Sequence, residues 1–269
     1  MVKTILVTGS TDGIGLETIK KLAKDGHYLL IHGRNANKLE KVKNIIEQIP
    51  NHGEIETYSY DLSSLSQVKD FANDIKSKHS KLDVLINNAG VFNVLEVRCE
   101  NNLDTRFTIN TIAPYLLTKL LMPILAQNSR VINLSSAAQA PFNVNSIKTL
   151  SPYSNGNVYA QSKLALTMWT FELAKKYGNG LNTFLAVNPG SLLASKLVKD
   201  AYGIEGSSLQ IGANILYEAA LSKKFNTSNG RYYDNDSKCF NNAYIDAYDS
   251  KLRNELIIVL DEIIDEFIK

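Results

Sequence analysis

TGSTDGIG, Thr8 to Gly15, decides the fold class: it follows the apolar run KTILV and precedes a segment of helical length. Its glycines stand at Gly9, Gly13 and Gly15, and glycine lets the backbone turn tightly and approach a ligand closely. The helix that follows points its unpaired N–H groups and the positive end of its dipole at the same space, which suits a pyrophosphate. The segment therefore predicts a dinucleotide site in the first strand-to-helix turn of a βαβ unit.

The spacing of these glycines, GxxxGxG, differs from the GxGxxG fingerprint, and no lysine follows that would make a P-loop. A purely structural turn is the alternative interpretation. The predicted cofactor contacts in this turn are Gly9, Ser10, Thr11, Gly13, Ile14 and Gly15.

Short β-branched runs alternate with amphipathic segments of helical length through the first two thirds of the chain. Strands are predicted at KTILVT, YLLIHG, EIETYSY, LDVLINN, RVINLS and LNTFLAV, and helices near 14–24, 37–48, 65–79 and 103–125 and from Val158. Strands separated by helices form βαβ units with a parallel sheet, and helices on both faces explain the continuous apolar strands. We predict one α/β domain over residues 1–269, a doubly wound parallel sheet in three α/β/α layers.

Two irregular regions and a helical tail complete the chain. About twenty residues rich in Asn, Ser and Pro follow Ser136, and residues 190–208 form a second irregular region that we predict to be the substrate loop. The tail, from about 246 to 268, predicts one or two amphipathic helices.

Composition favours a small-molecule partner in a reducing compartment. The net charge of +2 is interleaved, without the basic stripe or patch that nucleic acid or a membrane surface would need. Cys99 and Cys239 are isolated, and no signal peptide or apolar run of membrane-spanning length is present, so we expect a cytoplasmic protein.

The four histidines, His27, His32, His52 and His79, are scattered without the spacing of metal ligands, so no metal site is predicted. No GxSxG segment supports a hydrolase.

The end of the second predicted strand indicates the type of cofactor. A carboxylate at this point would bind a ribose 2′-hydroxyl, whereas an arginine would pair with a 2′-phosphate. The residues are His32, Gly33, Arg34 and Asn35, so the sequence favours NADP(H), with NAD(H) as the alternative. Asp12, in the glycine turn, opposes an added phosphate, and a solvated surface role is the other interpretation of Arg34.

Four segments together resemble the short-chain dehydrogenase/reductase family over nearly the whole chain. They are TGSTDGIG, the NNAG of Asn87 to Gly90, the pair Ser135 and Ser136 after RVINL, and YAQSK of Tyr159 to Lys163. Ser136 and Tyr159 are 23 positions apart, and this spacing, together with RFTINTIAPYLLTKLLMPIL and DAYDSKLRNEL, resembles the branch of retinol-dehydrogenase-like and WW-domain-oxidoreductase-like proteins.

The resemblance implies a Rossmann domain that transfers a hydride between a nicotinamide and a carbonyl or alcohol substrate. Tyr159 would exchange the proton on the substrate oxygen. An unperturbed tyrosine has a pKa near 10, and Lys163 would lower it and bind the nicotinamide ribose. Ser136 would orient the substrate oxygen, and Asn110 would position a water next to the lysine. Taken singly, Ser136 and Asn110 are better explained as cap or helix-surface residues, whereas together with Tyr159 and Lys163 in family order they favour the catalytic interpretation.

The resemblance also implies further cofactor contacts, with strand-end packing as the alternative for the asparagines. They are Asp61, Leu62, Asn88, Ala89, Gly90, Tyr159, Lys163, Pro189, Gly190 and the backbone of Leu192. The chain departs from the family where a threonine is common: Ala194 stands there, followed by Ser195. Phe142, Tyr153, Leu197 and Tyr202 are candidates for an apolar pocket, with ordinary packing as the alternative.

The spacing of YAQSK recurs in YLLTK, at Tyr115 and Lys119, where we expect packing and pairing within one helix. The rivals to an oxidoreductase are a catalytically silent dinucleotide-sensing or scaffold protein and a Rossmann-type methyltransferase, which would have an acid in place of Arg34. By family analogy, a homodimer or homotetramer would form through helices near 103–126 and 159–176.

Overall fold

The computed structural model describes residues 1–99, 102–149, 154–178, 182–195, 198–199 and 203–268. The strands are β1 Thr4–Val7, β2 Tyr28–Gly33, β3 Ile55–Ser59, β4 Leu82–Asn87, β5 Leu125–Leu134, β6 Thr183–Asn188, β7 Arg231–Asp234 and β8 Cys239–Asn241. The α-helices are α1 Gly13–Lys24, α2 Ala36–Glu47, α3 Leu65–Lys78, α4 Thr105–Phe107, α5 Ala113–Leu121, α6 Asn145–Lys148, α7 Asn155–Tyr177, α9 Leu209–Leu221 and α10 Ser250–Ile268. A π-helical turn, η1, spans Thr108–Ile112, and 3₁₀ turns are η2 Met122–Ile124, η3 Lys223–Phe225 and η4 Ile245–Tyr248.

The strands form one sheet in the order β3-β2-β1-β4-β5-β6-β7-β8. Every neighbouring pair from β3 to β7 is parallel, which confirms the predicted doubly wound sheet. The last pair, β7 and β8, is antiparallel, because a short turn and not a helix connects them. The strand order reverses between β1 and β4, which is where such sheets bind ligands.

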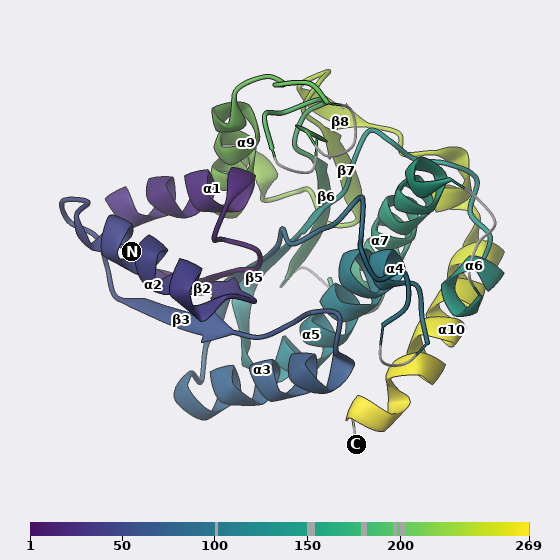
Figure 1. Ribbon diagram of the computed structural model, residues 1–269, viewed down its shortest axis with the longest axis horizontal. Helices are drawn as coiled ribbons and strands as arrows, with labels where there is room; N and C mark the ends of the chain where they lie inside the picture. Colours follow the sequence, from purple (N-terminus) through teal and green to yellow (C-terminus); the bar gives the residue numbers. More distant parts are fainter. Residues whose placement is uncertain (100–101, 150–153, 179–181, 196–197, 200–202, 269) are drawn as a thin grey trace.

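Helices cover both faces of the sheet and make three layers, with α1, α2 and α9 on one face and α3, α5 and α7 on the other (Figure 1). Each face has its own apolar core. Side chains alternate along a strand, so Leu6 packs toward α3 and α5 while Ile5 and Val7 pack toward α1. The fold is therefore one domain with the sheet at its centre.

Some boundaries differ from the predicted ones. The expected helix over 103–125 ends at Leu121, and β5 already begins at Leu125, because Pro123 cannot continue the helical hydrogen bonds. Helix α7 begins at Asn155, with the Ser154 side chain accepting a hydrogen bond from the Asn157 amide. The sequence pattern predicts no element between 208 and 245, whereas the structure has α9, β7 and β8 there.

The structure corrects the expectation that Tyr115 and Lys119 of YLLTK pair only within their own helix, because both hydrogen-bond to a residue of another helix. The Tyr115 hydroxyl and the Lys119 ammonium both donate to the Asp261 carboxylate of α10, at 2.8 and 2.9 Å. The lysine also lies over the tyrosine ring, 5.4 Å from its centre. Burial and the nearby carboxylate raise the pKa of Tyr115, so this tyrosine stays a neutral phenol.

Helix α10 packs against α3, α5 and α7, which are close to it in Figure 1. The helices that family analogy nominates for subunit contacts are thus already packed within the chain, and eight of the nine residues of α5 are buried. In the part of the chain that the structure describes, no helix has both the length and the apolar content to cross a bilayer.

We predict that Leu260→Ala destabilises the protein by about 3 kcal/mol, because a fully buried side chain of α10 leaves a cavity when truncated. Leu260 is 0% exposed, whereas Ile258 on the same helix is 58% exposed. Ile258→Ala is the matched control and should change the free energy of unfolding by less than about 0.5 kcal/mol. Urea denaturation measures both, and equal losses would mean that α10 does not pack as described.

Candidate active site

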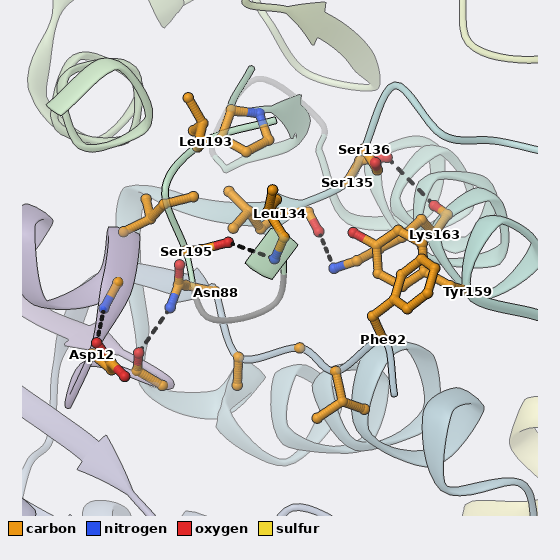
Figure 2. Close-up of a pocket in the computed structure, with 18 of the residues that line it drawn as sticks. Asp12, Asn88, Phe92, Leu134, Ser135, Ser136, Tyr159, Lys163, Leu193 and Ser195 are labelled. Carbon is orange, nitrogen blue, oxygen red and sulfur yellow. Dashed lines mark hydrogen bonds between the residues drawn. The ribbon is translucent and has the colours of Figure 1, made fainter. Parts of the chain in front are cut away.

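A cavity of about 620 Å³ opens at the carboxyl ends of β1, β4, β5 and β6 (Figure 2). The following predicted site residues line it: Gly9, Thr11, Gly13, Ile14, Arg34, Leu62, Asn88, Ala89, Gly90, Ser136, Tyr159, Lys163, Pro189, Gly190 and Leu192. Four predicted residues do not line it: Ser10, Gly15, Asp61 and Asn110. The predicted catalytic and cofactor residues therefore converge on one cavity, with these four exceptions.

The glycine turn lies so close to the end of β4 that two of its positions exclude a side chain. A Cβ on Gly9, whose φ is +64°, would stand 2.8 Å from the Ala89 Cα. A Cβ on Gly15 would stand 2.4 Å from the Gly9 carbonyl oxygen. Gly15 therefore acts by letting α1 approach the turn, and not by lining the cavity.

Hydrogen bonds hold the turn open toward the cavity. The side-chain amide of Asn88 donates to the carbonyls of Thr8 and Gly9 at 2.9 and 3.0 Å. The Asp12 carboxylate caps α1 by accepting from the backbone N–H of Gly13 at 2.7 Å. The amides of the first helical turn have no carbonyl four residues earlier within the helix, so they can bind an anion.

His32, at the end of β2, hydrogen-bonds to the glycine turn, a role that the sequence did not predict. Its Nδ1 accepts from the Gly9 amide at 3.2 Å, so its Nε2 carries the proton that is donated to the Tyr60 carbonyl, at 3.0 Å. The ring stacks on Phe71, and complete burial lowers the pKa of His32 to about 4. The imidazole is therefore neutral at physiological pH and fixes the direction of the Gly9 N–H. Its place at a strand end was the only signal in the sequence.

Ser10 and Asp61 turn away from the cavity. The Ser10 hydroxyl is buried, accepting from the His32 amide at 3.0 Å and donating to the His32 carbonyl at 3.2 Å. The Asp61 carboxylate accepts from the amide and hydroxyl of Ser63, at 2.9 and 2.8 Å. Ser10 thus ties the glycine turn to β2, and Asp61 stabilises the turn that follows β3.

Arg34 is exposed and lines the cavity just after β2, where the 2′-position of an adenine ribose would lie by analogy with other doubly wound folds. Thr11 packs against the backbone at Gly33, where an added Cβ would stand 2.6 Å from the Thr11 Cγ2. Asp12 lines the same cavity. The guanidinium can therefore face a ligand, in competition with one nearby carboxylate.

Tyr159 and Lys163 project from successive turns of α7 into the cavity, and the Phe92 ring lies beside the Tyr159 ring (Figure 2). The Lys163 ammonium lies 5.8 Å from the centre of the Tyr159 ring and donates to the Leu134 carbonyl at 2.7 Å. The Phe92 and Tyr159 ring centres are 5.0 Å apart. Unlike Tyr115, this tyrosine shares its helix face with a lysine that hydrogen-bonds to a backbone carbonyl and not to a carboxylate.

Burial lowers the pKa of Lys163 from its ordinary 10.5 to about 8. The side chain is therefore mostly an ammonium at neutral pH and loses its charge in mildly alkaline solution. A cation enclosed in this way acts strongly on any charge that develops beside it, because little water screens it.

The two serines after β5 have different places. Both serines line the cavity, but the Ser135 hydroxyl is buried and contacts the Thr167 hydroxyl at 2.7 Å, whereas Ser136 is half-buried. The Ser136 oxygen accepts from the Ala138 amide at 3.1 Å, so its proton can be donated to a ligand.

Asn110 lies in the π-helical turn η1, a type of turn often found at functional sites. Its amide brackets the backbone of Val91, accepting from the Val91 N–H at 2.8 Å and donating to the Val91 carbonyl at 2.9 Å. A Cβ on Gly90 would lie 3.2 Å from the Lys163 Nζ and 3.3 Å from the Asn110 Oδ1. The Asn110 side chain thus holds Gly90 and Val91 in place next to Lys163. Its expected link to a water stays a prediction.

The opposite wall follows β6. Ser195, and not Ala194, lines the cavity, with its Cβ 3.9 Å from the place of a Cβ on Gly13, and its hydroxyl accepts from the Val198 amide at 3.2 Å. Leu192 has a φ of +51° and accepts from the Ser207 amide at 2.7 Å.

The proposed substrate loop is only partly described, because residues 196–197 and 200–202 lie outside the described residues. Leu197, Tyr202 and Tyr153 fall among the undescribed residues, and Phe142 belongs to the core and does not line the cavity. The apolar lining of the cavity instead includes residues that sequence reasoning missed: Val91, Phe92, Ile109, Leu193 and Val198. Val91 and Phe92 directly follow NNAG, which was the available signal.

Within the described ranges, no group of three His, Cys, Asp or Glu side chains is arranged to hold a metal ion.

Sequence comparison relates the chain to known dehydrogenases. A family model of the short chain dehydrogenases matches residues 3–202. Human polyprenol dehydrogenase is 35% identical over 181 residues, 64% of this chain and 55% of that protein. Human retinol dehydrogenase 13 is 33% identical over 213 residues, 77% of this chain and 63% of that protein. The chain thus spans 55% and 63% of the length of these two relatives.

Solved structures share the fold. A protein from Mycobacterium paratuberculosis matches with a TM-score of 0.80 and 25% identity, covering 98% of this chain and 93% of that one. A short chain dehydrogenase from Shigella flexneri, complexed with NADP, matches with a TM-score of 0.68 and 24% identity, covering 87% of this chain and 97% of that one.

We predict that the wild-type protein gains stability relative to Lys163→Met by about 2 kcal/mol between pH 7.5 and pH 9.5. The folded-state pKa of Lys163, about 8, lies below its ordinary 10.5, so folding releases a proton between these values and the free energy of unfolding rises with pH. Urea denaturation of both proteins at the two pH values measures the difference. Stability curves that run parallel would mean that the lysine is not desolvated.

Proposed function

Because the chain belongs to the short-chain dehydrogenase family, a family of nicotinamide-dependent oxidoreductases, we propose that it interconverts a carbonyl and an alcohol with Tyr159 as the acid and base. The observation that carries the proposal is the placement of Tyr159 and Lys163 in one cavity, with the Ser136 hydroxyl lining the same cavity. Proton exchange on the substrate oxygen needs such a donor within reach of the reacting atom.

The residues of the cavity fit a dinucleotide. Gly9 and Gly13 line the cavity without a side chain, so a pyrophosphate can lie against bare backbone at the start of α1. Lys163 would bind the ribose hydroxyls, and Leu192 offers its backbone at the nicotinamide end. A bound nicotinamide would supply or accept the hydride.

The chain's own residues would handle the proton. Ser136 donates a hydrogen bond to the substrate oxygen and orients it toward Tyr159. The Lys163 ammonium, 5.8 Å from the centre of the Tyr159 ring, favours the phenolate by coulombic attraction, because its burial limits screening. In the reductive direction the phenol gives its proton to the oxygen, and in the oxidative direction the phenolate takes it.

NADP(H) is the proposed cofactor, with NAD(H) as the alternative. Arg34 lines the cavity at the end of β2, where its guanidinium can bind a 2′-phosphate through two hydrogen bonds. The Shigella flexneri structure, with the same fold, is an NADP complex, which supports the proposal by analogy.

The proposed substrate is a small to medium, partly apolar alcohol or carbonyl compound. The cavity has an apolar lining that includes Val91, Phe92, Ile109, Leu193 and Val198, and the Phe92 ring lies beside the Tyr159 ring. Relatives are named for retinol and polyprenol, both alcohols with an apolar chain, which agrees with this lining. The rival, a silent dinucleotide-sensing protein, would keep the cavity without turnover.

We expect Tyr159→Phe to lower kcat by about 1,000-fold while dinucleotide affinity is nearly unchanged, because only the exchanging hydroxyl is lost. Tyr115→Phe is the matched control, since Tyr115 precedes a lysine at the same spacing but bonds to Asp261 outside the cavity. Absorbance of the reduced nicotinamide, followed with aldehydes, ketones and quinones, gives the rates.

Most of the wild-type activity remaining in Tyr159→Phe would contradict this mechanism. Dinucleotide binding by the wild type without turnover of any carbonyl or alcohol would favour the sensing protein.

We expect Arg34→Asp to weaken NADPH binding by tenfold to about a hundredfold, since it removes a charge-assisted hydrogen bond and adds repulsion, while NADH binding changes little. Lys41→Asp reverses an exposed charge on α2 outside the cavity and is the control for general electrostatics. Fluorescence titration with both cofactors measures the dissociation constants. Equal weakening of NADPH and NADH would remove Arg34 from the phosphate site.

A further inference from the structure

The hairpin formed by β7 and β8, residues 231–241, lies beyond residues 3–202 matched by the family model. It is the last part of the sheet, with β7 parallel to β6 and β8 antiparallel to β7. No residue of the hairpin lines the cavity. Its side chains nevertheless hydrogen-bond to two segments that do.

The first contact is to Ser136. The Tyr232 hydroxyl donates to the Ser136 carbonyl at 3.1 Å, and the side-chain amide of Gln139 donates to the same oxygen at 3.0 Å. Tyr232 is 5% exposed and packs among the core residues on the α7 face of the sheet. A rigid, buried side chain from β7 therefore fixes the backbone that carries the Ser136 hydroxyl.

The second contact is to the wall that follows β6. The Asp236 carboxylate accepts three hydrogen bonds, from the Ser191 amide at 2.8 Å, the Ser191 hydroxyl at 2.6 Å and the Asn188 side chain at 2.9 Å. Asn235 adds two more, from its amide to the Asn188 carbonyl at 3.1 Å and from its side chain to the Pro189 carbonyl at 2.9 Å. Asn188, Pro189 and Ser191 all line the cavity.

Strand geometry makes this contact selective. Successive side chains point to opposite faces, so Tyr232 meets Ser136 while Tyr233 packs on the α9 face and its hydroxyl accepts from Lys224 at 2.8 Å. The two neighbouring tyrosines are similarly buried, but the Tyr232 hydroxyl bonds to a residue of the cavity and the Tyr233 hydroxyl bonds to Lys224 outside it.

We propose that the hairpin positions both walls at the catalytic end of the cavity: Tyr232 holds Ser136 for the substrate oxygen, and Asp236 holds Asn188 to Ser191 for the dinucleotide. The inference rests on the proposed function, because it assigns the hairpin to that same site. Tyr232 and Asp236 are positioning residues, since each acts through another residue.

The two residues should affect different constants. Loss of the Tyr232 hydroxyl loosens only the serine wall, so kcat falls while dinucleotide affinity does not. An amide in place of the Asp236 carboxylate has one acceptor oxygen for three donors, so the wall after β6 loses hydrogen bonds and dinucleotide affinity falls.

The test compares Tyr232→Phe and Asp236→Asn with the controls Tyr233→Phe and Asp25→Asn. Asp25 accepts from the Tyr217 hydroxyl at 2.5 Å, away from the cavity. We expect roughly a tenfold lower kcat for Tyr232→Phe at unchanged NADPH Kd, and roughly a tenfold higher NADPH Kd for Asp236→Asn. Both controls should match the wild type, and melting temperatures show whether a variant is merely destabilised.

Wild-type kcat in Tyr232→Phe together with wild-type Kd in Asp236→Asn would overturn the inference. A lower kcat together with a higher NADPH Kd in both variants would also overturn it, since that pattern indicates general destabilisation. A wild type without turnover on any carbonyl or alcohol would instead overturn the proposed function. In that case the serine half falls with it, and the Kd of Asp236→Asn still decides the dinucleotide half.

Discussion

The contact between the glycine turn and the end of β4 is the constraint on which the rest of the site depends. At Gly9 and Gly15 the backbones are too close for any side chain, and the Asn88 amide bridges the two strand ends. This contact places β1 and β4 side by side where the strand order reverses, which opens the cavity above them. His32 completes the arrangement, because its neutral ring fixes the Gly9 amide from the neighbouring strand.

The environment of each tyrosine decides which of the two identically spaced Tyr-Lys pairs can do chemistry. Tyr115 and Lys119 share the Asp261 carboxylate, which keeps that tyrosine a phenol. Lys163 donates instead to the Leu134 carbonyl, and its positive charge stays beside Tyr159. The same helical geometry therefore produces a structural pair in one case and the pair proposed for proton exchange in the other.

The hairpin of β7 and β8 and helix α10 pack against segments that form the cavity, but neither of them lines it. The Tyr232 hydroxyl on β7 donates to the Ser136 carbonyl, and Asp236 in the turn between β7 and β8 accepts hydrogen bonds from Asn188 and Ser191. Helix α10 packs against the helices that carry both Tyr-Lys pairs. Two parts of the protein thus meet at the cavity: an N-terminal part that contains the glycine turn, and a C-terminal part that hydrogen-bonds to Ser136 and to the segment after β6.

The sequence by itself determined the parallel sheet and the glycine turn, because these depend on local periodicity and on backbone freedom. The grouping of Ser136, Tyr159 and Lys163 followed from the resemblance of their segments, in chain order, to the family pattern. Only the tertiary structure decided that Asn110 fastens Val91, that Ser10 and Asp61 turn away, that Ser195 rather than Ala194 faces the cavity, and that Asp261 binds Tyr115. These outcomes depend on which side chains distant in the chain are buried together, and burial decides both which polar groups must pair and how a charge is stabilised.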